Sequence, residues 1–324
     1  MKETISIIIP VCNMEKYLKN CLLSVERQTY PHLEIVIVDY GSTDSSLKIV
    51  DSFAQTDSRI KQVSTKCDGP FRARLDGVSE ATGQWVGFID ADDEIESTMY
   101  ERLIDNALRH KKEISHCGLQ RIFPDGRVKY IGNTGELTTQ DRNTAIVELI
   151  EEQGSIASLC NKLFKADLFE RIFNNPYLKE DLRYGEDLLL NYLLFSAADG
   201  AVYEGVCPYH YMVHKGSLIM RRLNPNRVRD PIHVRDLIRN DISEELFPAA
   251  QKVYIRQCLL TYNMLITGTG RDVVDPEEIR RRISLEKKTF HLLGDRIEIL
   301  ADLLLESPDI YLKIVQDIKR AKKY

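Results

Sequence analysis

Four carboxylate side chains follow one short apolar segment. Residues 85–95 read WVGFIDADDEI, so that Asp90, Asp92, Asp93 and Glu94 fall within five positions. Like charges at the end of a strand repel one another unless a cation or exposure to water relieves them. Mg²⁺ and Mn²⁺ prefer oxygen ligands and often take only one or two carboxylates, with water and substrate phosphates completing the shell. The DADD tetrapeptide therefore fits a metal–diphosphate site, and it equally fits a solvated acidic turn.

Motifs that bind phosphate through a glycine-rich loop are missing from the sequence. It contains no G-x-x-x-x-G-K-[ST] segment, no G-x-G-x-x-G after a strand and no G-x-S-x-G elbow. A phosphate group would have to be held by a metal ion and by basic side chains.

The elements that must position these carboxylates alternate in type over the first hundred residues. Apolar, β-branched runs at 5–11, 33–39, 59–64 and 85–90 are typical of buried parallel strands. Segments with helical spacing of apolar residues follow them, at 14–25, 47–53, 70–81 and 99–108, and Asn13 is expected to cap the first. This alternation predicts a doubly wound α/β sheet. Ligands of such a sheet bind beyond the carboxyl ends of the strands, where Asp39 and the DADD run would lie.

The pattern changes after residue 110. Residues 114–123 and 127–132 flank Pro124-Asp125-Gly126 and predict a hairpin. Helices are expected at 141–152 and 187–198, with strands at 158–164 and 209–214. Only helical patterns follow, at 231–240, 244–266, 276–293, 296–305 and 308–323. We therefore expect a mixed sheet flanked by helices in residues 1–222 and a helical region in residues 223–324.

Composition excludes several classes of protein. The 324 residues carry a formal net charge of −5, which argues against a protein that coats nucleic acid. Seven cysteines without a CxxC pair suit a reducing compartment and give no zinc site. The apolar run at 5–11 is too short for a signal peptide, and no stretch approaches the ~20 apolar residues of a membrane helix. We expect a cytoplasmic protein with at most peripheral contact at the inner face of the membrane.

Several segments, in a fixed order, resemble family 2 glycosyltransferases with the GT-A fold. They are SIIIPVCNMEKYLKNCLLSVERQTYPHLEIVIVDYGSTDSS at 6–46 and ARLDGVSEATGQWVGFIDADD at 73–93. NKLFKADLFERI at 161–172, YGEDLLL at 184–190 and YHYMVHKGSL at 209–218 resemble later segments of bacterial members that build polysaccharides or glycosylate proteins. The resemblance spans about two-thirds of the chain, and the order of several motifs makes it more specific than any one of them.

The resemblance implies a reaction and a fold. The fold would be a GT-A domain, a Rossmann-like nucleotide-binding mixed sheet. The enzyme would move a sugar from a nucleotide diphosphate donor, with a UDP-sugar the expected one, and would invert the anomeric carbon. The acceptor would be a glycan, a lipid-linked saccharide or a glycoprotein, and Mn²⁺ or Mg²⁺ would be the cofactor.

The resemblance also carries residue roles on the donor side. Pro10 and Val11 end the first strand where the family holds the nucleoside. Asp39 and Tyr40 occupy the position of an acidic pair whose second member usually meets the base. From the residues alone, Arg72 and Arg74 open the third helix and could reach phosphate, although a solvated helix face is an equal interpretation.

The remaining roles fall on two acidic segments. Asp90, Asp92 and Asp93 lie on the DxD-type motif, with Asp90 and Asp92 toward the nucleotide sugar and Asp92 and Asp93 toward the metal. Asp187 would be the catalytic base, with Glu186 as the second choice. From the residues alone, Asp187 is also a good helix cap, because an Asp before an apolar helix often has that role.

His214 and Lys215 precede Gly216-Ser217, as in a loop that closes over the diphosphate. A histidine at a strand end is more often structural, so both interpretations remain open.

Tyr40 departs from the family pattern, which has a second Asp at that position. A tyrosine can stack on a base or bond through its hydroxyl, but it is a weaker acceptor than a carboxylate. The departure leaves the donor base open and motivates a rival hypothesis, a catalytically silent nucleotide-binding or scaffold protein. Apolar residues on more than one side of 244–266 predict either burial within the chain or a homo-oligomer formed through the C-terminal helices.

Overall fold

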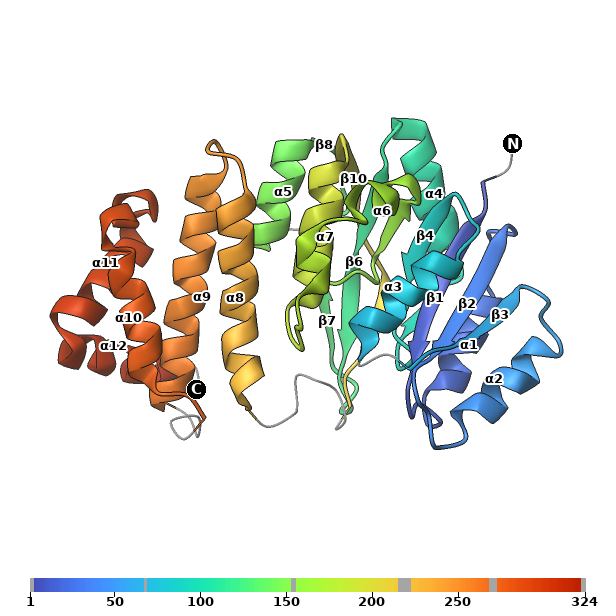
Figure 1. Ribbon diagram of the computed structural model, residues 1–324, viewed down its shortest axis with the longest axis horizontal. Coiled ribbons are helices and arrows are strands. Elements are labelled where there is room, and N and C mark those ends of the chain that lie inside the picture. Colours follow the sequence, from blue (N-terminus) through green and yellow to red (C-terminus); the bar gives the residue numbers. More distant parts are fainter. Residues whose placement is uncertain (1–2, 67–68, 153–155, 215–222, 268–272, 322–324) are drawn as a thin grey trace. The chain divides into compact units, whose positions relative to one another are not determined.

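A computed structural model describes residues 3–66, 69–152, 156–214, 223–267 and 273–321. The chain divides into two compact units, one of residues 1–180 and 187–221 and one of residues 181–186 and 222–324. Figure 1 traces the chain from blue at the N-terminus to red at the C-terminus.

The first unit is built on one mixed sheet. Its strands are β1 (Ile5–Val11), β2 (Leu33–Asp39), β3 (Ile60–Ser64), β4 (Trp85–Phe88), β5 (Glu94–Ile95), β6 (Ile114–Ile122), β7 (Val128–Ile131), β8 (Leu137–Asp141), β9 (Lys162–Lys165) and β10 (Gly200–Met212). The main path runs β3-β2-β1-β4-β9-β6-β10-β5, with β7 paired to β6 and β8 paired to β10. The first four strands of that path are parallel, whereas β9 is antiparallel to both β4 and β6.

Helices connect these strands. They are α1 (Leu18–Glu26), α2 (Ser46–Ala54), α3 (Pro70–Glu80), α4 (Met99–His110), α5 (Arg142–Glu151), α6 (Asp167–Ile172) and α7 (Glu186–Ala197), with a 3₁₀ turn η1 at Pro176–Lys179. Helix α3 packs on β1 and β2 at Gly77. A Cβ at Gly77 would lie 2.5 Å from Ile8 Cγ2 and 3.0 Å from Val38 Cγ2, so only a glycine permits this close approach.

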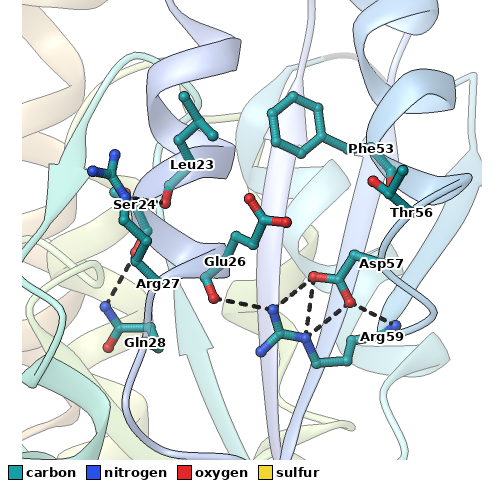
Figure 2. Close-up of polar contacts among 9 residues, drawn as sticks. All are labelled: Leu23, Ser24, Glu26, Arg27, Gln28, Phe53, Thr56, Asp57 and Arg59. Carbon is teal, nitrogen blue, oxygen red and sulfur yellow. Dashed lines mark hydrogen bonds and ion pairs between the residues drawn. The ribbon is translucent and has the colours of Figure 1, made fainter.

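A polar contact ties α1 to the turn between α2 and β3 (Figure 2). Arg59 Nη2 lies 2.6 Å from Asp57 Oδ2, and Arg59 Nε donates to both Asp57 oxygens. The same Nη2 donates to the Glu26 carbonyl at the end of α1, at 3.2 Å. Because orphan carbonyls at a helix end need donors, Arg59 serves α1 and the turn at once.

The second unit is helical. It contains α8 (Pro225–Asp241), α9 (Phe247–Thr267), α10 (Pro276–Leu285), α11 (Asp295–Glu306) and α12 (Pro308–Ala321), with a 3₁₀ segment η3 at Lys287–Leu292. Helices α8 and α9 lie side by side (Figure 1). Ile255, Cys258, Leu259, Tyr262 and Leu265 of α9 are buried in one core cluster of this unit. Burial in that core accounts for most of the apolar residues of α9, while Leu260 stays 57% exposed.

Most predicted elements occur, and the differences have local causes. Helix α8 begins at Pro225, where the Asn224 side chain accepts from Arg227 N–H, and not at Pro231, which lies inside the helix. Strand β9 begins at Lys162 and not at 158. Strands β5 and β8 and helix α6 were not predicted, because they are too short or too polar to show a period.

The predicted role of Asn13 was wrong. Asn13 has a left-handed backbone (φ 55°), and α1 begins only at Leu18. The Asn13 side-chain oxygen accepts from Thr43 N–H at 2.8 Å and Asp44 N–H at 3.3 Å. Asn13 therefore supports the loop before α2, which adjoins it because β1 and β2 are neighbours.

Candidate active site

One guanidinium joins two of the predicted site carboxylates. Arg74 of α3 has its side chain 4% exposed; its Nη2 lies 2.6 Å from Asp90 Oδ1, and its Nη1 lies 3.0 Å from Asp187 Oδ1. Asp90 follows β4, while Asp187 is the second residue of α7. Three elements that are distant in the chain thus bring together the DADD run and the candidate base. Glu186, the first residue of α7, is buried.

The surroundings of Asp187 favour its neutral form. Burial raises the pKa of its carboxyl group, the Arg74 charge opposes that increase, and the nearby Asp90 charge adds to it. A hydrogen bond from the Leu159 N–H also lowers this pKa. A carboxylate whose pKa lies above the usual range binds a proton more readily, which is the property a general base needs.

Buried polar side chains hold the loop that carries Leu159. Lys162 Nζ donates to the carbonyls of Ile156 (2.5 Å) and Ser158 (2.6 Å) and to Asn161 Oδ1 (2.9 Å). The Lys162 side chain is fully buried, and burial lowers its pKa to about 7. Three close acceptors satisfy this ammonium group, so Lys162 fixes the backbone beside Asp187.

Asp92 pairs with the histidine that follows β10. Asp92 Oδ2 lies 2.6 Å from His214 Nε2, and their side chains are 21% and 15% exposed. The Tyr17 ring stacks on the imidazole, with ring centroids 4.3 Å apart and planes 28° apart. Burial raises the pKa of Asp92, as does Asp90, while His214 opposes the increase. The side chains of Asp92 and His214 are therefore the part of this site that a ligand in solvent can still reach.

Asp93 lies beneath that turn and is 1% exposed. Its Oδ2 accepts from Tyr209 O–H at 2.5 Å, and its Oδ1 accepts from Met212 N–H at 2.8 Å. Burial raises its pKa well above the usual range, and the charges of Asp90 and Asp92 add to this. Both oxygens are thus engaged, and Asp93 ties the DADD turn to β10.

The predicted nucleoside-binding residues lie at the same edge of the sheet. Pro10 and Val11 at the end of β1 are in register with Val38 and Asp39 of β2. Asp39 is buried and accepts from the Gly41 and Ser42 N–H groups at 3.3 and 3.2 Å. Tyr40 N–H donates to Val11 O at 3.1 Å. This edge holds both predicted residue pairs of the nucleoside site.

The residues that would hold a divalent cation form a pair. In the described ranges, no three or more His, Cys, Asp or Glu side chains converge on one point. Mg²⁺ and Mn²⁺ bound with a nucleotide often use only one or two protein side chains, so Asp92 with His214 fits such an ion. Lys215 lies outside the described residues.

Comparison with known proteins identifies the family. A model of glycosyl transferase family 2 matches residues 6–173. The chain belongs to glycosyltransferase family 2. The uncharacterized glycosyltransferase EpsJ of Bacillus subtilis (strain 168) is 30% identical over 233 residues, which are 71% of this chain and 64% of EpsJ. The chain therefore spans less than two-thirds of that relative.

Two solved structures with similar folds confirm the expected GT-A fold. Residues 1–349 of S. aureus TarS, in complex with UDP-GlcNAc, give a TM-score of 0.69 at 19% identity, covering 99% of this chain and 93% of that one. The mannosyltransferase PcManGT of Pyrobaculum calidifontis, in complex with GDP-Man and Mn²⁺, gives 0.58 at 16% identity, covering 98% and 84%. Among the residues described, no helix is long and apolar enough to cross a membrane.

Sequence reasoning missed several partners of the site. It placed Arg74 toward phosphate and did not foresee its contact with Asp187, because sequence spacing does not encode a contact between α3 and α7. Lys162 and Tyr17 were not singled out as site residues. A lysine at the start of an otherwise apolar strand was the available signal for Lys162.

Proposed function

We propose that this family 2 member is an inverting, metal-dependent glycosyltransferase that moves a sugar from a nucleotide diphosphate sugar to a saccharide. The observation that carries the proposal is the Arg74 bridge. It sets Asp187, a carboxylate with a raised pKa, beside Asp90 of the DADD turn. The candidate proton acceptor, Asp187, and the DADD turn, which we assign to the donor diphosphate, would then belong to one site.

In this proposal Asp187 takes the proton from the acceptor hydroxyl as that oxygen attacks the anomeric carbon. The glycosidic bond to the diphosphate breaks in the same displacement, so the anomeric centre inverts. Arg74 and the Leu159 N–H orient the carboxylate of Asp187. Glu186 is the alternative base.

The donor side is assigned to the opposite end of the DADD turn. Asp92 and His214 would hold Mn²⁺ or Mg²⁺, which when bound stabilises the charge on the leaving diphosphate. Asp93, expected from the sequence as a second metal ligand, has both oxygens engaged by Tyr209 and Met212 and would act by holding the turn. The nucleoside would lie against Pro10 and Val11, with Asp39 and Tyr40 near the base.

Donor, acceptor and place belong to the same proposal. The structural neighbours were solved with UDP-GlcNAc and with GDP-Man, which supports a nucleotide diphosphate sugar. We propose a UDP-sugar as the first candidate. The acceptor would be a polysaccharide, a lipid-linked saccharide or a glycoprotein, and the enzyme would act in the cytoplasm or at the inner face of the membrane. Residues 1–222 would form the catalytic domain, and the helices of 223–324 would support it or mediate self-association.

A donor screen tests this proposal. Thermal shifts with UDP-GlcNAc and GDP-Man, each with and without Mn²⁺, should show metal-dependent stabilisation by at least one donor. Transfer or hydrolysis of that donor should fall by about 10²–10⁴-fold in Asp187→Asn. The control Asp167→Asn changes an exposed carboxylate of α6 and should keep the wild-type rate. A chain that binds neither nucleotide sugar, with or without Mn²⁺, would instead favour the silent scaffold.

A further inference from the structure

Two cationic side chains face each other across the β6–β7 hairpin. Arg121 of β6 and Lys129 of β7 are directly opposite in the antiparallel register. Directly opposed like charges destabilise a pair of strands. Neither charge is compensated, because no carboxylate among the described residues pairs with Arg121 or Lys129.

Several other arginines of the same unit pair with carboxylates. Arg127, in the turn of the same hairpin, lies 2.7 Å from Asp125, and Arg102 and Arg171 contact Glu204 and Glu113. Arg121 has no such partner among the described residues, and its buried Nε, like that of Arg74, donates to no protein atom of those residues. The Arg121 side chain is half-buried and has no carboxylate partner among the described residues, so its guanidinium can still bind an oxyanion from outside the chain through nitrogens other than the buried Nε.

An aromatic ring supports the guanidinium of Arg121. Tyr211 of β10 is its neighbour in register, and Arg121 Cζ lies 5.6 Å from the centroid of that ring. Tyr211 and Tyr209 are two residues apart and so share one face of β10. Since the Tyr209 hydroxyl reaches Asp93, this face is the one directed toward the DADD turn.

Charge places Tyr211 close to the active site as well. Burial raises the pKa of Tyr211 to about 12, the carboxylates Asp93, Asp92 and Asp90 add to the increase, and Arg121 opposes it. The row from Tyr211 through Arg121 to Lys129 therefore crosses three neighbouring strands, β10, β6 and β7, and its Tyr211 end feels the charge of the acidic turn.

The sheet order separates this row from the nucleoside edge. Strands β1 and β2, which carry Val11 and Asp39, lie on one side of β4, whereas β9 intervenes between β4 and β6. Arg121 of β6 therefore lies three strands from β1 in the sheet order, and we assign an anion bound there to the acceptor and not to the nucleoside of the donor.

We propose that Arg121 and Lys129, with Tyr211 as the support for the guanidinium, form an acceptor subsite for an anionic saccharide bearing phosphate or carboxylate groups. The assignment of this site to the acceptor rests on the proposed function as a glycosyltransferase. The assignment of an anionic ligand rests on the geometry of the hairpin alone.

Binding of matched polymers tests the subsite. Fluorescence anisotropy would compare phosphorylated dextran, carboxymethyl dextran and neutral dextran of equal length, and the charged form that binds more tightly distinguishes phosphate from carboxylate. We expect at least one charged form to bind about tenfold more tightly than the neutral one, because charge-assisted hydrogen bonds are stronger than neutral ones. Arg121→Gln and the exposed Lys129→Gln should each weaken that binding about five- to tenfold.

Arg127→Gln is the matched control, since it removes one positive charge from the same hairpin at a residue already paired with Asp125. An equal loss in Arg127→Gln, or equal binding of neutral dextran, would overturn the subsite. Displacement of the charged dextran by UDP would also overturn it, because Arg121 would then serve the donor. If nucleotide sugars fail to bind but charged dextran still depends on Arg121, the anion site stands and the proposed transferase function fails.

Discussion

The Arg74→Met substitution removes the guanidinium that lies between Asp90 and Asp187. Methionine has a similar length and fills the space beside α3, so the change mainly deletes charge and hydrogen bonds. In the variant, the carboxylates of Asp90 and Asp187 would lose the guanidinium that they share in the wild-type protein. Both the stability of the fold and the ionisation of the candidate base should respond.

The burial of the three side chains sets the size of the effect. Removing one partner of a fully buried ion pair costs about 3–5 kcal/mol. Arg74 is 4% exposed, but the Asp90 and Asp187 side chains are 31% and 26% exposed, so water can partly solvate them once the cation is gone. We expect the free energy of unfolding to fall by about 2–3 kcal/mol, which corresponds to a melting temperature lower by roughly 5–10 °C.

The pH dependence follows from the sign of the Arg74 effect. Arg74 lowers the pKa of Asp187, so Arg74→Met should raise that pKa further above its usual range. The base works when deprotonated, and the acid limb of the kcat profile should therefore move to higher pH. A carboxyl whose pKa is higher in the folded protein than in the unfolded one favours folding less as pH rises through the folded pKa. The loss of stability should thus be smallest in acid and largest above that pKa.

Two measurements check this reasoning, thermal unfolding across pH and the pH profile of sugar transfer. Arg74→Lys is the control, because it keeps a charge but its single ammonium cannot span both carboxylates as a fork does, and its effects should be intermediate. An acid limb of Arg74→Met that coincides with the wild-type limb would refute the claim that Arg74 sets the ionisation of Asp187. An unchanged melting temperature at neutral pH would refute the energetic argument.

Asp92→Asn should weaken Mn²⁺-dependent donor binding by at least about 10-fold, since even residues that only orient a metal ligand have effects of that size. Isothermal titration of the variant with and without Mn²⁺ measures this, and wild-type affinity in the presence of Mn²⁺ would contradict the role of Asp92. Gly77→Ala should cost about 1–3 kcal/mol of stability, because the new methyl group would overlap Ile8 Cγ2, and a urea midpoint equal to the wild type would contradict the packing. Asp57→Ala should cost about 1–2 kcal/mol at neutral pH through loss of the Arg59 contacts. Those contacts hold the pKa of Asp57 below its usual range, so the cost should vanish as pH falls through that lowered pKa, and a cost independent of pH would count against it.

Periodicity was enough to predict the strands that carry the nucleoside edge. Strands β1 and β2 have the predicted bounds, because continuous apolar runs ending in Val11 and Asp39 admit few other structures. The hairpin around Pro124-Asp125-Gly126 was also confirmed, since its turn residues and flanking strands agree. Local signals are sufficient where a segment is long and its pattern is regular.

Contacts between distant segments were not predictable in the same way. The sequence showed that Asp93 is one of four crowded acids, but not that its carboxylate would be buried against Tyr209 of β10. Nor did it show Arg121 opposite Lys129, because register depends on which strands pair and where the turn falls. Crowding was visible from the composition of one segment, whereas the partners that relieve it came from two others, α3 and residues 209–214.

The position of β9 has a consequence for how the protein is made. Strands β4 and β6 are both available early in synthesis, yet they do not pair with each other; β9, some forty residues after β6, fills the space between them. Until Lys162–Lys165 leaves the ribosome, the nascent chain carries two unsatisfied strand edges, which are sites of aggregation. Chaperone dependence during translation should consequently fall when β9 emerges and end only when β10, which pairs with the other edge of β6, has followed it.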